Sequence, residues 1–188
     1  MYYVIQVKTG KEEKAISAIK KQLAEKDGFD IFTPSRITLR KYHGEFKEVE
    51  ERCFPGYIFV ETDKPKDLFF DLYWTPEYTK LLGREGLTYN FLPLNKDESR
   101  MVDILYNANN DRKTPISDIE VVEGQKIRVI TGPLMGQEGL ITKVNLHKRI
   151  VTIKLSIFKR ETEVDVGINI IGKIDEPKIQ KYVQKSNK

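Results

Sequence analysis

The chain has 188 residues, of which 39% are hydrophobic and 32% are charged, a composition typical of globular proteins with room for one or two compact cores. A single cysteine, Cys53, excludes an internal disulfide and a cysteine-based metal cluster, and no run approaches the ~20 apolar residues of a membrane span. The first residues lack the basic and apolar regions of a signal peptide, so we expect a cytoplasmic protein.

The formal net charge is +4, and it is distributed unevenly along the chain. Residues 1–106 carry 17 Lys/Arg against 18 Asp/Glu, whereas residues 107–188 carry 15 against 10. This asymmetry suggests that the C-terminal part contacts nucleic acid. A lysine-rich tail that only aids solubility would give the same counts.

Strand and helix patterns alternate at the beginning of the chain. The mostly apolar run at 2–7 predicts a strand buried on both faces. Residues 12–26 have apolar positions at helical spacing, and Thr9 and Glu12 have the spacing of a capping box at the start of that helix. A second strand is expected at 29–32.

A charged segment follows. Residues 36–42 and 46–54 flank Gly44, which predicts a β-hairpin, and their density of charge indicates that it protrudes into solvent. The turn Pro55-Gly56 then leads into an apolar strand at 57–60.

The remaining N-terminal elements are a helix over 64–73, a short strand over 79–82 and a helix that opens with Asn95 and Glu98 at capping-box spacing. This order predicts one α/β sandwich over residues 1–106, with an antiparallel sheet and flanking helices.

The C-terminal part begins with a change of composition. Residues 107–120 are polar and predict a linker. A small β-barrel is expected over 121–174 and a charged tail over 175–188. Alternating apolar residues in the barrel surround three glycines, whose freedom to adopt positive φ suits tight corners: Gly132, Gly136 and Gly139.

Catalytic patterns are missing from the sequence. It contains no Ser/His/Asp order, nucleophile elbow, phosphate loop or metal-ligand cluster, and its two histidines lie far apart. We therefore expect no enzymatic activity, no metal and no cofactor.

Three motifs, in this order, resemble the NusG family of transcription elongation factors. They are Tyr3-Val4-Ile5-Gln6-Val7, then Phe54-Pro55-Gly56-Tyr57-Ile58-Phe59-Val60, then a KOW motif at 123–144 with the hairpin Ser156-Ile157-Phe158-Lys159-Arg160. Lys159 replaces the family's usual glycine. The segments 8–13 and 164–168 are closer to the specialised antitermination paralogues of the LoaP and RfaH type, and we place the chain among them.

The resemblance implies an α+β fold, in which an NGN-like α/β sandwich is linked to a small KOW-type SH3-like β-barrel. It also implies that the N-terminal domain grips the clamp helices of the largest RNA polymerase subunit through Tyr57, Phe59, Tyr78, Leu81 and Leu82. Tyr57 and Phe59 are two residues apart and share one face of their strand. Core packing is the alternative for both.

Two sets of basic residues resemble nucleic-acid contacts of the family. On the first helix, Lys14, Lys20 and Lys21 would touch the non-template DNA strand, although a solvated helix face has the same pattern. On the barrel, a cationic rim would hold an RNA hairpin in a nascent leader transcript. Its members are Lys143, His147, Lys148, Arg149, Lys159 and Arg160.

A protein partner is the alternative for the barrel. In ordinary family members Ile157, Phe158 and Arg160 serve a ribosomal protein or the termination factor Rho. The sequence thus predicts a monomeric elongation and antitermination factor that binds RNA polymerase and suppresses pausing and termination, its barrel recruiting a leader RNA hairpin or a protein. The alternatives are a general NusG-type elongation factor and, from another class, a ribosome-associated KOW RNA-binding protein.

Overall fold

A computed structural model describes residues 1–23, 26–73, 79–82, 92–121, 127–157 and 160–171. The chain forms two compact units. Unit 1 comprises Met1–Pro34 and Arg52–Asp103, and unit 2 comprises Ser35–Glu51 and Ile104–Lys188. Within the described residues, no helix has the length and apolar character needed to cross a membrane.

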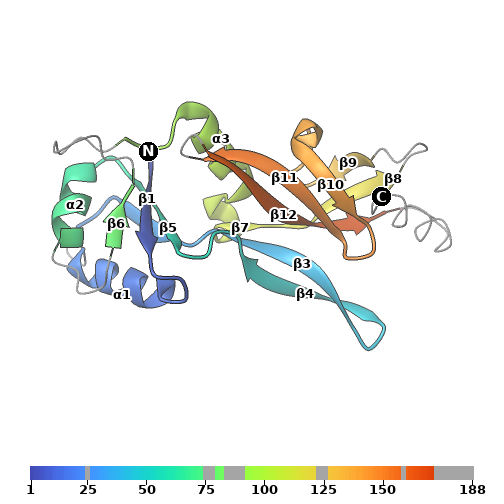
Figure 1. Ribbon diagram of the computed structural model, residues 1–188, viewed down its shortest axis with the longest axis horizontal. Coiled ribbons are helices and arrows are strands. Elements are labelled where there is room, and N and C mark those ends of the chain that lie inside the picture. The colour runs from blue at the N-terminus through green and yellow to red at the C-terminus, as the bar shows by residue number, and fades with distance from the viewer. Residues whose placement is uncertain (24–25, 74–78, 83–91, 122–126, 158–159, 172–188) are drawn as a thin grey trace. The chain divides into compact units, whose positions relative to one another are not determined.

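Unit 1 contains a four-stranded antiparallel sheet (Figure 1). The strands, in spatial order, are β2 (Phe29–Phe32), β5 (Tyr57–Thr62), β1 (Tyr2–Val7) and β6 (Thr79–Leu81). The helices are α1 (Glu12–Gln22), α2 (Pro65–Tyr73) and, at the boundary with unit 2, α3 (Lys96–Leu105). The predicted capping box of α3 is confirmed, because Asn95 and Glu98 each accept a 2.9 Å hydrogen bond from the other's backbone N–H.

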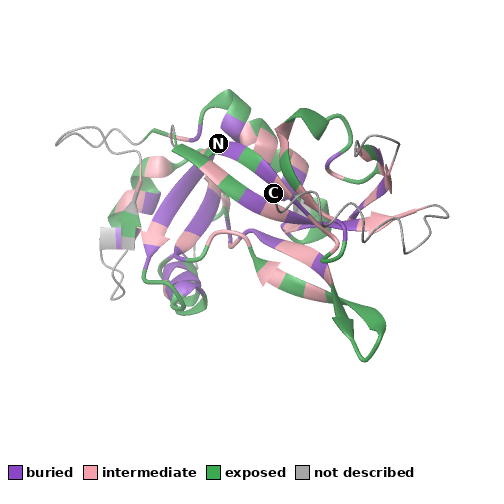
Figure 2. Ribbon diagram, turned by 45° about the vertical axis from the view of Figure 1, so that its right-hand side comes forward, coloured by how far each residue is buried: buried purple, intermediate pink, exposed green. Residues whose placement is uncertain are grey.

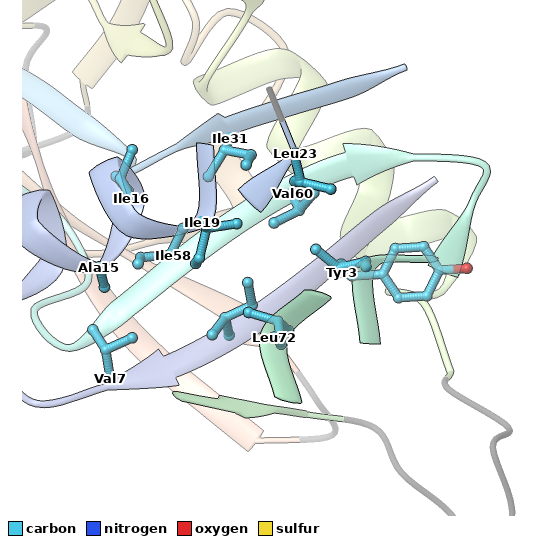
Figure 3. Close-up of a cluster of buried hydrophobic side chains, with 12 residues drawn as sticks. Tyr3, Val7, Ala15, Ile16, Ile19, Leu23, Ile31, Ile58, Val60 and Leu72 are labelled. Atoms are coloured by element: carbon cyan, nitrogen blue, oxygen red, sulfur yellow. The ribbon is translucent and has the colours of Figure 1, made fainter. Parts of the chain in front are cut away.

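The core of unit 1 lies between one face of this sheet and the helices α1 and α2 (Figure 3). Cross-strand partners share a face, and Tyr3 lies opposite Val60 while Ile5 lies opposite Ile58. Helix side chains complete the core: Ala15, Ile16, Ile19, Leu68 and Leu72. Tyr2 and Val4 alternate with these residues and are also buried, so the prediction of a first strand buried on both faces is confirmed.

Unit 2 contains a five-stranded sheet. Its strands, in spatial order, are β10 (Ile141–Asn145), β11 (Ile150–Ile157), β12 (Arg160–Ile170), β8 (Ser117–Val121) and β9 (Ile127–Thr131). All neighbours are antiparallel except β12 and β8, which are parallel. The buried side chains of this unit include Ile119, Val129, Val151, Ile153, Leu155, Val164, Val166 and Ile168.

The predicted linker at 107–120 is wrong in its second half. It contains a 3-10 turn (Ala108–Asn110), a short strand β7 (Lys113–Thr114) and the start of β8. Ile119 is fully buried and pairs with Val129 of β9, so the barrel begins at Ser117 rather than at 121. The prediction rested on the polar composition of the whole segment, and this average concealed the alternation of polar and apolar residues at 117–121 that is typical of a strand.

Glycines shape the turn after β9. Gly132 has φ +97, and a Cβ at this position would lie 2.7 Å from Cα of Ser117. Gly136 also has positive φ, at +74, but faces open space. Gly139 was expected to behave likewise, and this was wrong: it lies in a 3-10 turn (Glu138–Leu140) without a left-handed φ.

The predicted hairpin is confirmed as β3 (Ser35–Tyr42) and β4 (Glu45–Arg52), and β7 pairs in parallel with β3. His43 and Gly44 form the turn, and both have positive φ, as two-residue hairpin loops require. The distal half is exposed, as Figure 2 shows. The proximal half is not, because Ser35 and Thr38 are buried and β3 packs on β12, so the hairpin falls in unit 2. The domain bounds 1–106 stay a prediction.

Candidate interaction surfaces

The sheet of unit 1 has an aromatic face opposite the helices. Phe59 of β5 lies opposite Phe32 of β2, with ring centroids 5.8 Å apart, and the ring of Phe54 lies 5.5 Å from that of Phe59. Phe59 is only 1% exposed, so the expectation of an exposed side chain is wrong for this residue. Tyr57 is half-buried and remains accessible on this face.

Three further residues were predicted to join this surface. Leu82 is half-buried, and its backbone N–H donates to the carbonyl oxygen of Val4 at 2.8 Å. Leu81 pairs in the strand register with Ile5, but its side chain lies outside the described residues, as does Tyr78. The structure therefore places Tyr57 and Leu82 on accessible positions of unit 1.

A buried carboxylate fixes the turn that precedes Tyr57. The predicted capping box of Thr9 and Glu12 is wrong: the N-cap is Lys11, with no side-chain hydrogen bond. The Glu12 carboxylate is 1% exposed, accepts the Gly56 N–H at 2.6 Å and pairs with Nη1 of Arg52 at 2.9 Å. Glu12 thus joins the start of α1 to the Pro-Gly turn.

The electrostatics of this carboxylate follow from its surroundings. Burial by itself raises the pKa of Glu12, but backbone N–H donors, among them that of Gly56, and the charge of Arg52 outweigh it. The pKa of Glu12 therefore lies below its usual range, and the carboxylate is ionised at neutral pH. No local pattern could have revealed this site, because its partners are about forty residues away in sequence.

The three lysines predicted on α1 are exposed, as expected. Lys20 and Lys21 occupy the last turn, where their charge also favours the helix dipole. Their contact with DNA stays a prediction.

The predicted cationic rim of the barrel divides into two places. Lys143, His147, Lys148 and Arg149 lie in or beside the turn between β10 and β11, whereas Arg160 starts β12 at the far end of β11. Because a strand rises about 3.3 Å per residue, the two ends of β11 are roughly 23 Å apart. A single rim is therefore wrong. Lys159 and Phe158 lie outside the described residues.

The basic residues near the turn between β10 and β11 differ in whether their charge is already paired. Nζ of Lys143 pairs with the Glu163 carboxylate at 2.9 Å, which neutralises much of its charge. His147 and Lys148 are exposed, and the Lys148 N–H donates to Oδ1 of Asn145 at 2.9 Å, which closes the turn.

Arg149 is the unusual member of this turn. Its φ is +56, and its guanidinium Cζ lies 5.1 Å from the ring centroid of Phe46 on the hairpin. Its Nη1 is buried with no hydrogen-bond acceptor among the described residues, and burial lowers the pKa of Arg149. An aromatic residue in a charged hairpin was the one local sign of this contact in the sequence.

At the second place, Ile157 lies opposite Arg160 where β11 and β12 meet. Ile157 is half-buried and Arg160 is exposed, so both are accessible to a partner.

Comparison with known proteins identifies the fold. A family model described as "Transcription termination factor nusG" matches residues 1–103, more than half of the chain, and a KOW motif model matches residues 123–154. The chain belongs to the NusG family. It is a NusG-type transcription termination/antitermination factor, and its place in the specialised LoaP and RfaH branch stays a prediction.

Relatives of similar length carry the NusG name. Proteins called "Transcription termination/antitermination protein NusG" from Thermus thermophilus and Streptococcus pyogenes are 26% and 27% identical to this chain. The matches cover 92% of this chain in both cases, and 97% and 96% of those proteins. A structure titled "Domain interaction in Thermotoga maritima NusG" aligns with a TM-score of 0.51 at 21% identity over 88% of this chain and 92% of that one, which supports the fold alone.

Proposed function

We propose that this NusG-family factor binds RNA polymerase through the aromatic face of unit 1 and engages a nascent leader RNA through unit 2, and that it thereby suppresses pausing and termination. The observation that carries the polymerase contact is the accessible Tyr57 beside the buried rings of Phe59 and Phe32 and the half-buried ring of Phe54.

A surface of this kind suits a protein partner. Helices α1 and α2 pack on the opposite face of the sheet, so they do not cover Tyr57. Aromatic side chains concentrate binding energy at interfaces because they bury large area with few rotatable bonds. The bond from Gly56 to Glu12 holds the backbone immediately before Tyr57, which pre-organises the ring.

The polymerase contact is tested with purified RNA polymerase core enzyme and full-length protein. Tyr57→Ala should weaken binding about tenfold or more, the effect of removing an interface hot spot. Tyr42→Ala, at an exposed tyrosine of unit 2, is the matched control and should bind as the wild type does. Equal affinity for Tyr57→Ala and wild type would refute the assignment.

The RNA contact is supported by unpaired cations in the turn between β10 and β11, namely Lys148 and Arg149. Phosphate neutralisation makes such binding fall steeply with salt. In transcription across an intrinsic terminator preceded by the cognate leader, the wild type should raise read-through and Lys148→Ala should reduce that gain. Unchanged read-through with and without the protein would exclude antitermination.

A general elongation role is the second candidate. Arg160 is exposed and Ile157 half-buried at the opposite end of β11, a position suited to a protein partner. Under this alternative Arg160→Ala weakens binding to Rho or to a ribosomal protein, while Lys148→Ala leaves it intact.

A further inference from the structure

The hairpin of β3 and β4 packs on β12 of the barrel, and the two backbones approach closely at Gly167. A Cβ at Gly167 of β12 would clash with the carbonyl oxygen of Ile37 and would lie 3.1 Å from Cα of Thr38. Gly167 has no left-handed φ, so the backbone alone does not require glycine there. The close approach of the β3 backbone is what requires glycine at this position. Gly167 also lies opposite Ile150 in the register, so the hairpin docks beside the turn that carries Arg149.

This docking brings an aromatic ring of the hairpin under a cation of the barrel. The Phe46 ring has the Arg149 guanidinium carbon 5.1 Å from its centroid and Nζ of Lys41 at 5.9 Å. Phe46 nevertheless remains 41% exposed, so it is not a core residue. A guanidinium stacked on a ring keeps donors in its own plane available to an anion.

The distribution of unpaired charge points to the same place. Carboxylates pair with several of the described basic side chains of unit 2, for example Lys113 with Glu50 and Lys154 with Glu161. In the part of unit 2 that the structure describes, the solvent-accessible cations without an ion pair are Lys41, Lys47, Lys148, Arg149 and Arg160. All but Arg160 lie at the hairpin tip or in the turn between β10 and β11.

We propose that the hairpin tip and this turn form one composite surface for single-stranded nucleic acid, in which Phe46 positions Arg149 to bind a phosphate. The inference deepens the proposed RNA contact and rests on it. Lys41 and Lys148 provide further phosphate partners, and Tyr42, 46% exposed, offers a ring on which a base stacks.

Two details of Arg149 fit this role. Its buried Nη1 has no acceptor among the described residues, and no carboxylate there compensates its charge. A phosphate that binds at the accessible part of this half-buried side chain supplies the missing compensation for its charge. Glu48 lies two residues from Phe46 on the same face of the strand. Its negative charge repels the phosphate, so removing that charge should raise the affinity, whereas removing the Phe46 ring should lower it.

The test measures affinity of the full-length protein for a labelled RNA of about 12 nucleotides, a length within the usual range of single-strand sites, and for DNA of the same sequence. Phe46→Leu should weaken binding about threefold to tenfold, the range of a partly desolvated cation–π contact, and Phe46→Tyr should restore it. Glu48→Gln should tighten binding. The RNA and DNA arms identify which strand the surface prefers.

A double-mutant cycle separates positioning from a general structural effect. In the Arg149→Ala background, Phe46→Leu should cause no further loss, because the ring acts through Arg149. If wild type binds and Lys148→Ala weakens it while Phe46→Leu does not, the RNA contact stands and the composite surface is refuted. Tighter binding by Phe46→Leu, meaning that the hairpin covers Arg149, also refutes it. If wild type binds neither strand, the composite surface is refuted, and terminator read-through tests the leader RNA contact separately.

Discussion

Removing the buried carboxylate of Glu12 should destabilise unit 1 strongly. Glu12→Ala leaves the Gly56 N–H without its acceptor in a site that is 1% exposed, which costs about 1–3 kcal/mol. Arg52 is 39% exposed, so solvent screens the lost ion pair and it adds only about 0–1 kcal/mol. The sum is about 1–4 kcal/mol, equivalent to a lower melting temperature by roughly 4–30 °C for a unit of this size.

Urea titration followed by fluorescence suits this measurement, because the single tryptophan, Trp74, falls within the sequence range of unit 1. Glu13→Ala is the matched control. Glu13 pairs with the same Arg52 at 2.9 Å but is 69% exposed, so its loss should cost less than about 0.5 kcal/mol. Equal losses for the two variants would show that burial and the Gly56 bond do not determine the energy.

The contribution of Glu12 to the free energy of unfolding depends on pH, and the direction of this dependence follows from its pKa. Because the pKa of Glu12 is lower in the folded state than its ordinary value of 4.5, folding favours the ionised form. Its contribution is present above that ordinary value and is lost as pH falls through the folded pKa. The gap in unfolding free energy between wild type and Glu12→Gln should therefore narrow below pH 4.5. A gap that widened on acidification would contradict the direction of the shift.

Three backbone and capping changes give further expectations. Gly167→Ala should lower the free energy of unfolding by about 1–3 kcal/mol, because the added methyl group overpacks the contact with β3. Amide hydrogen exchange in β3 should then accelerate as the hairpin separates from the barrel. Unchanged exchange would disprove the close approach. Gly132→Ala should cost more than Gly136→Ala in thermal melts, because both have positive φ but only Gly132 meets Ser117; similar melting points would argue against this. Asn95→Ala should cost about 1 kcal/mol in urea titration through loss of the α3 cap, and no change would mean that the cap is redundant.

Local patterns in the sequence predicted most of the elements. The strand at 2–7, the charged hairpin and the Asn95 cap each depend on residues within one or two turns of chain, where periodicity and capping preferences operate. Helix α1 was expected to extend to 26 but ends at Gln22.

Several of the errors involve partners distant in sequence. Glu12 has the spacing of a helix cap, yet its carboxylate bonds to Arg52 and Gly56, which no local pattern reveals. Phe59 was expected at the interface mainly from the family resemblance, and alternation gives the side of a strand but not what covers it. The packing of the hairpin on Gly167 could not be foreseen either, because about 125 residues separate the two in the chain.

The insertion of the hairpin between β2 and β5 has a consequence for synthesis on the ribosome. Pro34 and Cys53 are joined by a 2.9 Å backbone hydrogen bond, so unit 1 can close its sheet while the hairpin extends from it. Gly167 is translated about 125 residues after the hairpin tip, a delay of roughly 6–25 s at ~5–20 residues per second. During that interval the Thr38 side of the hairpin is uncovered and open to chaperones, and nascent chains stalled before β12 should be cleaved there by protease more readily than the finished protein.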